Sequence, residues 1–157
     1  MENSFKYRAF ITYAHEDENQ ARWLRKKLEG FPIPKNLVGG KGKFGKIPSR
    51  LYPIFRDRDE LPGSAQLGSV IEEALYDSSH LIVLCSPNAV KSRWVNEEIR
   101  MFKAMGKADR VLCLVLDGEP MAADVKNDPE MECLPLAARR RIDQNGEITE
   151  QIHEPGA

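Results

Sequence analysis

Trp94 and Glu98 are the two residues whose types and spacing best suit a catalytic site. They stand four positions apart in a stretch with helical periodicity, so their side chains lie one above the other on a helix. The apolar stripe of this helix is carried by Val95, Ile99 and Phe102. At about 100° per residue, Glu98 lies roughly 60° and Trp94 roughly 100° from Val95, which puts both on the border between the buried and exposed faces. A carboxylate on such a border can be partly desolvated beside an indole and still reach a ligand.

A plain amphipathic helix explains the same spacing without any chemistry. In that alternative Trp94 is partly buried for packing and Glu98 is solvated, and such pairs are common on amphipathic helices. The neighbouring Glu97 provides a contrast, because it points roughly 160° from the centre of the apolar stripe and therefore into solvent. Spacing alone favours the plain helix, so a functional role for Glu98 needs a second line of support.

The segment from Gly40 to Lys46 matches the first half of a phosphate-binding loop, with glycines and a lysine at the required spacing. The rest of that motif is missing. Ile47 stands where Ser or Thr would hold magnesium, and Pro48 stands where a helix would begin. We therefore predict a flexible basic loop here rather than a nucleotide cradle.

Metal-binding patterns are weak in this chain. None of the three histidines stands three or four positions from another His or a Cys, and the three cysteines form no CxxC pair. A zinc site and a disulfide framework are both poorly supported on these spacings. Asp57, Asp59 and Glu60 alternate with Arg56 and Arg58, whose charges offset the attraction for a hard cation, so we expect a solvated turn.

The length and composition are those of one soluble globular domain. The chain has 157 residues, of which 41% are hydrophobic and 30% charged, enough to build a single core. The 23 basic and 24 acidic residues leave a net charge of -1, which gives no overall electrostatic case for nucleic acid or an anionic membrane. The start, Met1 to Lys6, lacks the apolar run of a signal peptide, and no apolar run is long enough to span a membrane, so we expect a cytoplasmic protein.

Apolar runs alternate with helical stretches, which predicts a parallel sheet with helices on both faces. Strands are expected near 9–13, 52–55, 81–85 and 111–116, and helices up to Gly30, over 67–75 and from about 89 to 105. The runs 81–85 and 111–116 are apolar on both faces, so they are expected to be central strands.

Two segments lie outside this alternation. Residues 31–53 hold four prolines, four glycines and five basic residues without an acid, and we expect a long basic surface loop there. Residues 118–157 are expected to form an irregular tail, with a small hairpin around Asn145-Gly146. Residues 5–157 are therefore expected to form a single domain.

Several motifs in the right order and spacing resemble the Toll/interleukin-1 receptor (TIR) domain family over residues 5 to about 118. They are the run Ala9 to Tyr13, Phe55-Arg56-Asp57 leading to Leu61-Pro62-Gly63, Leu84 to Asn88, and Ser92-Arg93-Trp94 followed by Glu98. The resemblance implies a flavodoxin-like, three-layer α/β sandwich, with five mostly parallel strands in the order 2-1-3-4-5 and helices on both faces.

Two features depart from the family pattern. The 31–53 segment is longer than in compact animal TIR domains and is similar to the Pro/Gly-rich segment of many bacterial TIR proteins that carry further C-terminal domains. No fifth strand with its last helix is evident after Leu116. We therefore expect either an N-terminal fragment of a longer protein or a four-stranded sheet completed irregularly by the tail.

The resemblance implies an activity, because some TIR domains cleave the nicotinamide–ribose bond of NAD+. These enzymes carry a glutamate on the helix after the third strand, four residues beyond a tryptophan or similar residue, and Trp94 and Glu98 match that pattern. Glu98 is then the expected catalytic residue, stabilising an oxocarbenium-like transition state, and Trp94 is expected to stack on nicotinamide. The products would be nicotinamide and linear or cyclic ADP-ribose, or a base-exchange product. NAD+ is the substrate, and neither a cofactor nor a metal is expected.

Further substrate-binding residues are expected at the carboxyl ends of the strands, where open α/β sheets bind their ligands. The candidates there are Tyr13, Ala14, His15, Arg56, Asp57 and Ser86. In the family the site is completed by the BB loop of a neighbouring molecule. The matching residues are Arg58, Asp59, Glu60, Leu61, Pro62 and Gly63.

This resemblance implies a bacterial signalling or antiviral defence protein that self-assembles into a homo-oligomer or filament and is triggered by C-terminal sensor domains outside this chain. The alternative is a non-catalytic module that only binds other TIR domains through its BB loop. A phosphoryl-accepting receiver domain has the same architecture and is set aside. Although Glu16 and Asp17 follow the first strand, Asp117 stands where such a domain needs a lysine.

Overall fold

A four-stranded parallel sheet forms the centre of the molecule in the computed structural model, which describes residues 5–56 and 67–153. The strands β1 (Tyr7–Thr12), β4 (Ile54–Arg56), β5 (Ser78–Cys85) and β6 (Val111–Val115) lie in the order β4-β1-β5-β6. This is the order predicted for the first four strands of the family. The predicted fifth parallel strand is not found in the part of the chain that the structure describes, where residues after β6 add nothing to this sheet.

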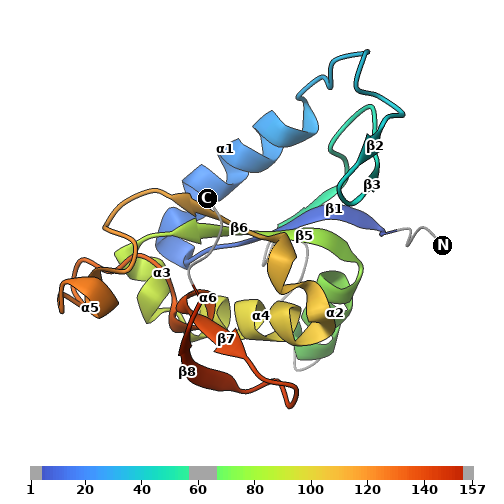
Figure 1. Cartoon of the computed structure of the whole chain (residues 1–157). Coiled ribbons are helices and arrows are strands. Elements are labelled where there is room, and N and C mark those ends of the chain that lie inside the picture. Colours follow the sequence, from blue (N-terminus) through green and yellow to red (C-terminus); the bar gives the residue numbers. More distant parts are fainter. Residues whose placement is uncertain (1–4, 57–66, 154–157) are drawn as a thin grey trace.

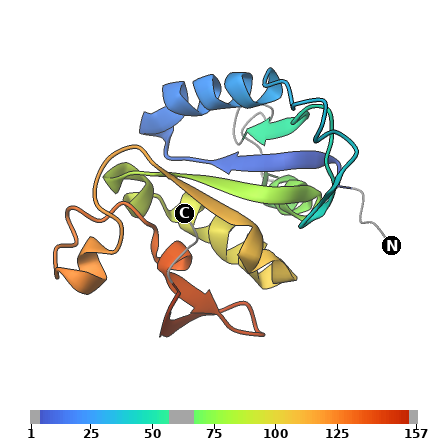
Figure 2. The same cartoon turned by 45° about the horizontal axis from the view of Figure 1, so that its top comes forward.

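Helices cover both faces of the sheet, which gives three layers (Figures 1 and 2). The helix α1 (Glu18–Glu29) lies on one face, and α2 (Leu67–Tyr76) and α4 (Arg93–Phe102) lie on the other. The alternation along β1 explains this division, because successive side chains of a strand point to opposite faces. Ile11 packs in the cluster that contains Ala21 of α1, whereas Phe10 packs in the larger cluster with the helices α2 and α4.

The helix predicted from about 89 to 105 is in fact two helices. The short helix α3 (Pro87–Lys91) ends at Ser92, where the backbone is extended and α4 begins. The Ser92 hydroxyl accepts a hydrogen bond from the backbone N–H of Val95 at 3.3 Å, an N-cap that starts the second helix. After Phe102 the chain makes a π-helical turn (Lys103–Lys107), within which Gly106 has a φ of 83°, a conformation that favours glycine.

The strand β6 is an edge strand, so the prediction of a central position for it was wrong. Leu112, Leu114 and Val115 are between 42% and 46% exposed. The run is apolar on both faces, but β6 pairs only with β5 among the described residues, and α1 packs over the β1–β4 side of the sheet. Periodicity records which residues are apolar; it does not show whether a neighbouring layer covers them.

The 31–53 segment is largely irregular, as predicted, but it contains a small antiparallel hairpin. Its strands are β2 (Lys41–Gly42) and β3 (Gly45–Lys46), with Lys41 opposite Lys46. The short 3-10 turns His15–Asp17 and Ala108–Arg110 precede α1 and β6.

The tail is more ordered than predicted. It contains α5 (Ala122–Val125), α6 (Leu136–Arg139) and the antiparallel strands β7 (Arg140–Ile142) and β8 (Ile148–Ile152), which confirm the hairpin expected around Asn145-Gly146. The buried carboxylate of Glu132 organises this segment, because it accepts hydrogen bonds from the backbone N–H groups of Met121 and Leu134 at 2.9 and 3.1 Å. The tail thereby packs against α4, where Asn96 accepts a hydrogen bond from the N–H of Ala137 at 2.7 Å.

Candidate functional site

The carboxylate of Glu98 lies inside the protein at the carboxyl end of β1. The residue is 1% exposed, and its Oε1 accepts a hydrogen bond from Thr12 Oγ1 at 2.9 Å. Thr12 is the last residue of β1 and shares a face with Phe10, so alternation directs its hydroxyl towards α4. A buried carboxylate is costly unless it is hydrogen-bonded, and Thr12 supplies such a bond.

This burial corrects the prediction that Glu98 lies on the border of the helix face. The helix α4 contacts α2, α6, β1 and β5. The hydrogen bond from Thr12 shows that Glu98 faces β1, so the buried face of α4 is wider than the predicted apolar stripe. Glu98 is therefore enclosed together with Val95, Ile99 and Phe102.

Trp94 lies one helical turn before Glu98 and is more open to solvent than predicted. Its side chain is 48% exposed, and the guanidinium carbon of Arg93 lies 5.9 Å from its ring centroid. The plain amphipathic alternative required a partly buried Trp94 and a solvated Glu98, and the structure has the opposite distribution. An accessible aromatic ring and a buried carboxylate thus neighbour each other at the start of α4.

Glu97 faces outward, as predicted, and is also paired with a neighbouring arginine. It forms an ion pair with Arg100, whose Nε donates to Glu97 Oε2 at 2.9 Å. The Arg100 guanidinium holds the pKa of Glu97 below its usual range. Glu97 therefore keeps its charge at the surface, away from the end of β1.

A second buried polar contact joins two connections at the same edge of the sheet. The Ser86 hydroxyl donates to Asp17 Oδ2 at 2.6 Å and accepts a hydrogen bond from the N–H of Ala89 at 3.1 Å, as the N-cap of α3. Both Ser86 and Asp17 are buried. The contact therefore fixes the segment after β1 against the segment after β5, and Ser86 has a structural part in the site whatever else it contacts.

Of the other predicted site residues, some are buried, one is exposed and the rest lie outside the described residues. Tyr13, Ala14 and Arg56 are buried at the carboxyl ends of β1 and β4, whereas His15 is exposed. Tyr13 packs in the apolar cluster beneath α1. The predicted residue Asp57 and the loop residues Arg58, Asp59, Glu60, Leu61, Pro62 and Gly63 lie outside the described residues.

Sequence reasoning missed Thr12 and Asp17 as parts of this site. Thr12 lies within the expected strand 9–13, where the sequence assigns it no role beyond the strand itself. The sequence could have indicated Thr12 through the alternation of the strand. Thr12 is the last residue of β1 and lies on the same face as Phe10, next to the site. Asp17 was weighed only as a possible receiver acid, and no spacing rule links it to Ser86, which is 69 residues away.

The described residues contain neither a cluster of metal ligands nor a membrane-spanning helix. Within residues 5–56 and 67–153, no three His, Cys, Asp or Glu side chains are grouped in a way that could hold a metal ion. In the same ranges, no helix has the length and apolar character needed to cross a membrane.

The chain is similar to known proteins over most of its length. A family model of the TIR-like domain of the Thoeris protein ThsB matches residues 10–120. The NAD(+) hydrolase ApTIR of Actinoplanes sp. is 31% identical over 119 residues, which cover 73% of this chain and 14% of that protein. Toll-like receptor 4 of Sus scrofa is 32% identical over 88 residues, which cover 56% of this chain and 9% of the receptor.

A solved structure has the same fold. The TIR domains of the activated Roq1 resistosome, which directly recognises the pathogen effector XopQ, superpose with a TM-score of 0.55 at 20% identity. The match covers 80% of this chain and 66% of that chain. The curated relatives are much longer than the matched segment, so the chain corresponds to one part of each. The family match spans most of the chain and the sheet order is that of the fold, and the chain therefore belongs to the family of the TIR-like domain of the Thoeris protein ThsB.

Proposed function

We propose that this domain cleaves the nicotinamide–ribose bond of NAD+ and that Glu98 is its catalytic residue. The observation that carries the proposal is the buried, hydrogen-bonded carboxylate of Glu98 at the carboxyl edge of the sheet, one helical turn from the accessible ring of Trp94. Open α/β sheets bind ligands at this edge. The similarity to a NAD(+) hydrolase over most of the chain supports the substrate.

The chemistry suits a fixed negative charge. When the C–N bond to C1′ of the ribose breaks, nicotinamide leaves with the bonding electron pair, and positive charge develops on the ribose as an oxocarbenium ion. Glu98 stabilises that charge electrostatically, which is most effective in a site that excludes water. A water molecule then adds to C1′ and loses a proton to give ADP-ribose, or an internal nucleophile adds to give a cyclic product.

Thr12 and Trp94 have supporting parts in this proposal. The Thr12 hydroxyl holds one oxygen of Glu98 in place, so the carboxylate is oriented before substrate binds. The exposed ring of Trp94 offers a flat apolar face on which nicotinamide can stack. Neither part requires a metal ion.

Self-association is the proposed means of activation. Residues 58–63 of one copy would complete the substrate site beside Glu98 of the next, so that one chain alone has low activity. A longer natural protein would supply the trigger for assembly, in keeping with relatives that extend far beyond the matched segment.

A binding module without catalysis is the second candidate, and the exposed leucines of β6 favour it. Leu112 and Leu114 leave an apolar strip at the sheet edge that a partner could cover. On this alternative Glu98 would be a buried structural carboxylate only.

One assay distinguishes the two candidates. Concentrated protein is incubated with NAD+, nicotinamide release is quantified, and the product mass separates linear ADP-ribose, cyclic ADP-ribose and base-exchange products. Release that disappears in the Glu98→Gln variant supports the enzyme. A folded, concentrated and assembled protein that releases no nicotinamide would establish the binding module instead.

A further inference from the structure

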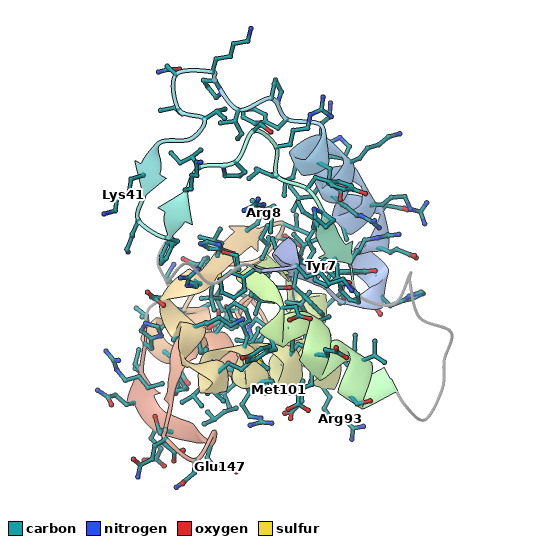
Figure 3. All side chains as sticks on the ribbon, turned by 90° about the vertical axis from the view of Figure 1, so that its right-hand side faces the viewer. Tyr7, Arg8, Lys41, Arg93, Met101 and Glu147 are labelled. Atoms are coloured by element: carbon teal, nitrogen blue, oxygen red, sulfur yellow. The ribbon has the colours of Figure 1, made fainter. Side chains whose placement is uncertain are left out.

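A concave surface lies at the amino-terminal edge of the sheet, opposite the edge that holds Glu98. It is a cleft of about 810 Å³ between the β2–β3 hairpin, the first residues of β1 and the turn before β6. Figure 3 looks at this edge end-on, with Arg8 of β1 near the centre and Lys41 on the hairpin to its left. The cleft therefore combines parts of the chain that lie far apart in the sequence.

The charged side chains that line this cleft are all positive. The described side chains that line it include Arg8, Lys43, Lys46 and Arg110 but no carboxylate. Within residues 5–56 and 67–153, none of these four cations forms an ion pair with an acidic side chain. Like charges gathered around one hollow repel each other and raise the local concentration of anions.

Arg110 is the best positioned of these cations. Its guanidinium carbon lies 4.3 Å from the ring centroid of Phe44 and 5.4 Å from that of Phe5, and one terminal nitrogen donates to the Ser79 hydroxyl at 3.3 Å. The ring of Phe44 is itself held edge-on against His80, with centroids 4.9 Å apart. A guanidinium that stacks on aromatic rings keeps its plane fixed and presents its N–H groups at the edge, a geometry that matches phosphate oxygens.

We propose that this cleft binds a compact phosphorylated anion of the size of a diphosphate-bearing nucleotide. Arg110 would donate to the phosphate oxygens, while Arg8, Lys43 and Lys46 would neutralise the remaining charge. The cleft volume falls within the roughly 300 to 1,000 Å³ that small-molecule sites usually have. This binding goes beyond the proposed NAD+ cleavage and does not depend on it, since the two sites lie at opposite edges of the sheet.

The surroundings favour a compact ligand over a nucleic acid strand. Two smaller hollows adjoin the cleft, and each brings in a carboxylate: Glu29 lines one of about 360 Å³, and Asp77 lines one of about 440 Å³. A long polyanion would have to pass these carboxylates, whereas a diphosphate fits between them.

The phosphate-loop motif remains excluded as the basis of this site. Lys46 belongs to the hairpin strand β3, and the next element along the chain is the strand β4 and not a helix. The anion would instead be held by side chains from several segments of the chain.

Calorimetric titration of the purified chain with inorganic pyrophosphate at low salt tests the proposal. We expect saturable binding of one pyrophosphate per chain. The Arg110→Gln variant should bind at least about tenfold more weakly, because one charge-assisted hydrogen bond is lost. Lys43→Gln should weaken binding by about threefold or more and should leave the fold intact, because the Lys43 side chain is exposed and lies over the neighbouring Phe44 ring. The matched control is Arg141→Gln, an exposed arginine on β7, which should leave binding unchanged.

Further measurements with the Glu98→Gln variant and with a DNA duplex show where the anion binds and which kind of anion the cleft prefers. Binding that survives in Glu98→Gln but falls in Lys43→Gln assigns the anion to this cleft and not to the catalytic edge. Absence of saturable binding, or equal affinity in the wild type, Arg110→Gln and Lys43→Gln, would overturn the proposal. Tighter binding of a short DNA duplex than of pyrophosphate, lost in the same variants, would also overturn it, because the cleft would then serve a polyanionic chain.

Discussion

Glu98 and Glu97 are adjacent residues with the same chemistry and opposite surroundings. Glu98 is enclosed and accepts a hydrogen bond from Thr12, whereas Glu97 is half-exposed and paired with Arg100. A carboxylate in a water-excluded site acts more strongly on a nearby developing cation than one at the surface. The pair therefore offers a comparison in which only the position of the charge differs.

Glu98→Gln is expected to abolish nicotinamide release, while Glu97→Gln largely preserves it. Glutamine keeps the size of the side chain but removes the charge, which should raise the barrier by at least about 3 kcal/mol, or a hundredfold in rate. The cost of Glu97→Gln is limited to a surface ion pair, about 0.2 to 1 kcal/mol of stability. Initial rates of both variants are compared after circular dichroism has shown that they are folded. Full activity of folded Glu98→Gln would remove Glu98 from the catalytic role.

Thr12 is a positioning residue, and its hydroxyl can be tested apart from its packing. Thr12→Val keeps the shape but removes the donor to Glu98, so kcat should fall by about tenfold or more with little change in KM. Thr12→Ser restores the hydroxyl and should recover most of the loss. A purely structural role would instead lower the melting temperature of Thr12→Val and leave kcat of the folded fraction unchanged.

At the scale of the elements, Lys107 joins α2 to β5 after the π-helical turn. Its ammonium donates to the carbonyl oxygens of Leu75 and Ser78, both at 2.8 Å, and lies 4.3 Å from the ring centroid of Phe102. It thus satisfies carbonyls at the end of α2 that have no partner within the helix. Burial lowers the pKa of Lys107 from 10.5 to about 8.

Lys107→Met should destabilise the domain and change how its stability depends on pH. Removing the donor leaves buried carbonyls unsatisfied, at a cost of about 1 to 3 kcal/mol near pH 7. In the wild type the folded state releases the lysine proton near pH 8 and the unfolded state near pH 10.5. The unfolded state therefore binds more protons between these values, so the stability that comes from the titration of Lys107 rises with pH across that window. This pH-dependent part is lost as the pH falls towards 8, and the contribution of the hydrogen bonds remains.

Denaturant unfolding of both proteins between pH 7 and 11 measures this difference. The wild-type curve minus the Lys107→Met curve should rise across the window, and the subtraction removes the part due to Lys103, whose pKa is also lowered to about 8. A flat difference would mean that the buried ammonium of Lys107 titrates near its ordinary value.

At the scale of the whole molecule, the proposed active site needs two copies of the chain. NAD+ cleavage should therefore increase faster than linearly with protein concentration. A complementation experiment gives a sharper test: Glu98→Gln retains the 58–63 segment, and Pro62→Ala retains Glu98. Mixing the two weakly active variants should produce more nicotinamide than the sum of the separate samples. Strict proportionality to concentration, without complementation, would show that one chain suffices.

The sequence by itself determined the four strands of the central sheet and which residues are apolar, and the resemblance to the family gave the order of these strands. The strands and the apolar faces follow from local backbone geometry, because the periods of 2 and 3.6 are set within a few residues. The predicted apolar stripe of Val95, Ile99 and Phe102 is confirmed, because all three side chains are buried in one cluster. The spacing of Trp94 and Glu98 indicated the candidate site only together with the resemblance to the TIR family, because spacing alone favours a plain amphipathic helix.

Only the tertiary structure decided what covers each face. Glu98 is buried where α4 packs on β1 and its carboxylate meets Thr12, and β6 is an edge because no described strand pairs with its outer side. The contact of Thr12 with Glu98 joins residues 86 positions apart, and the basic cleft joins Arg8 to Arg110. Such contacts depend on how whole elements pack across long stretches of chain, and no period or spacing along the sequence records that packing.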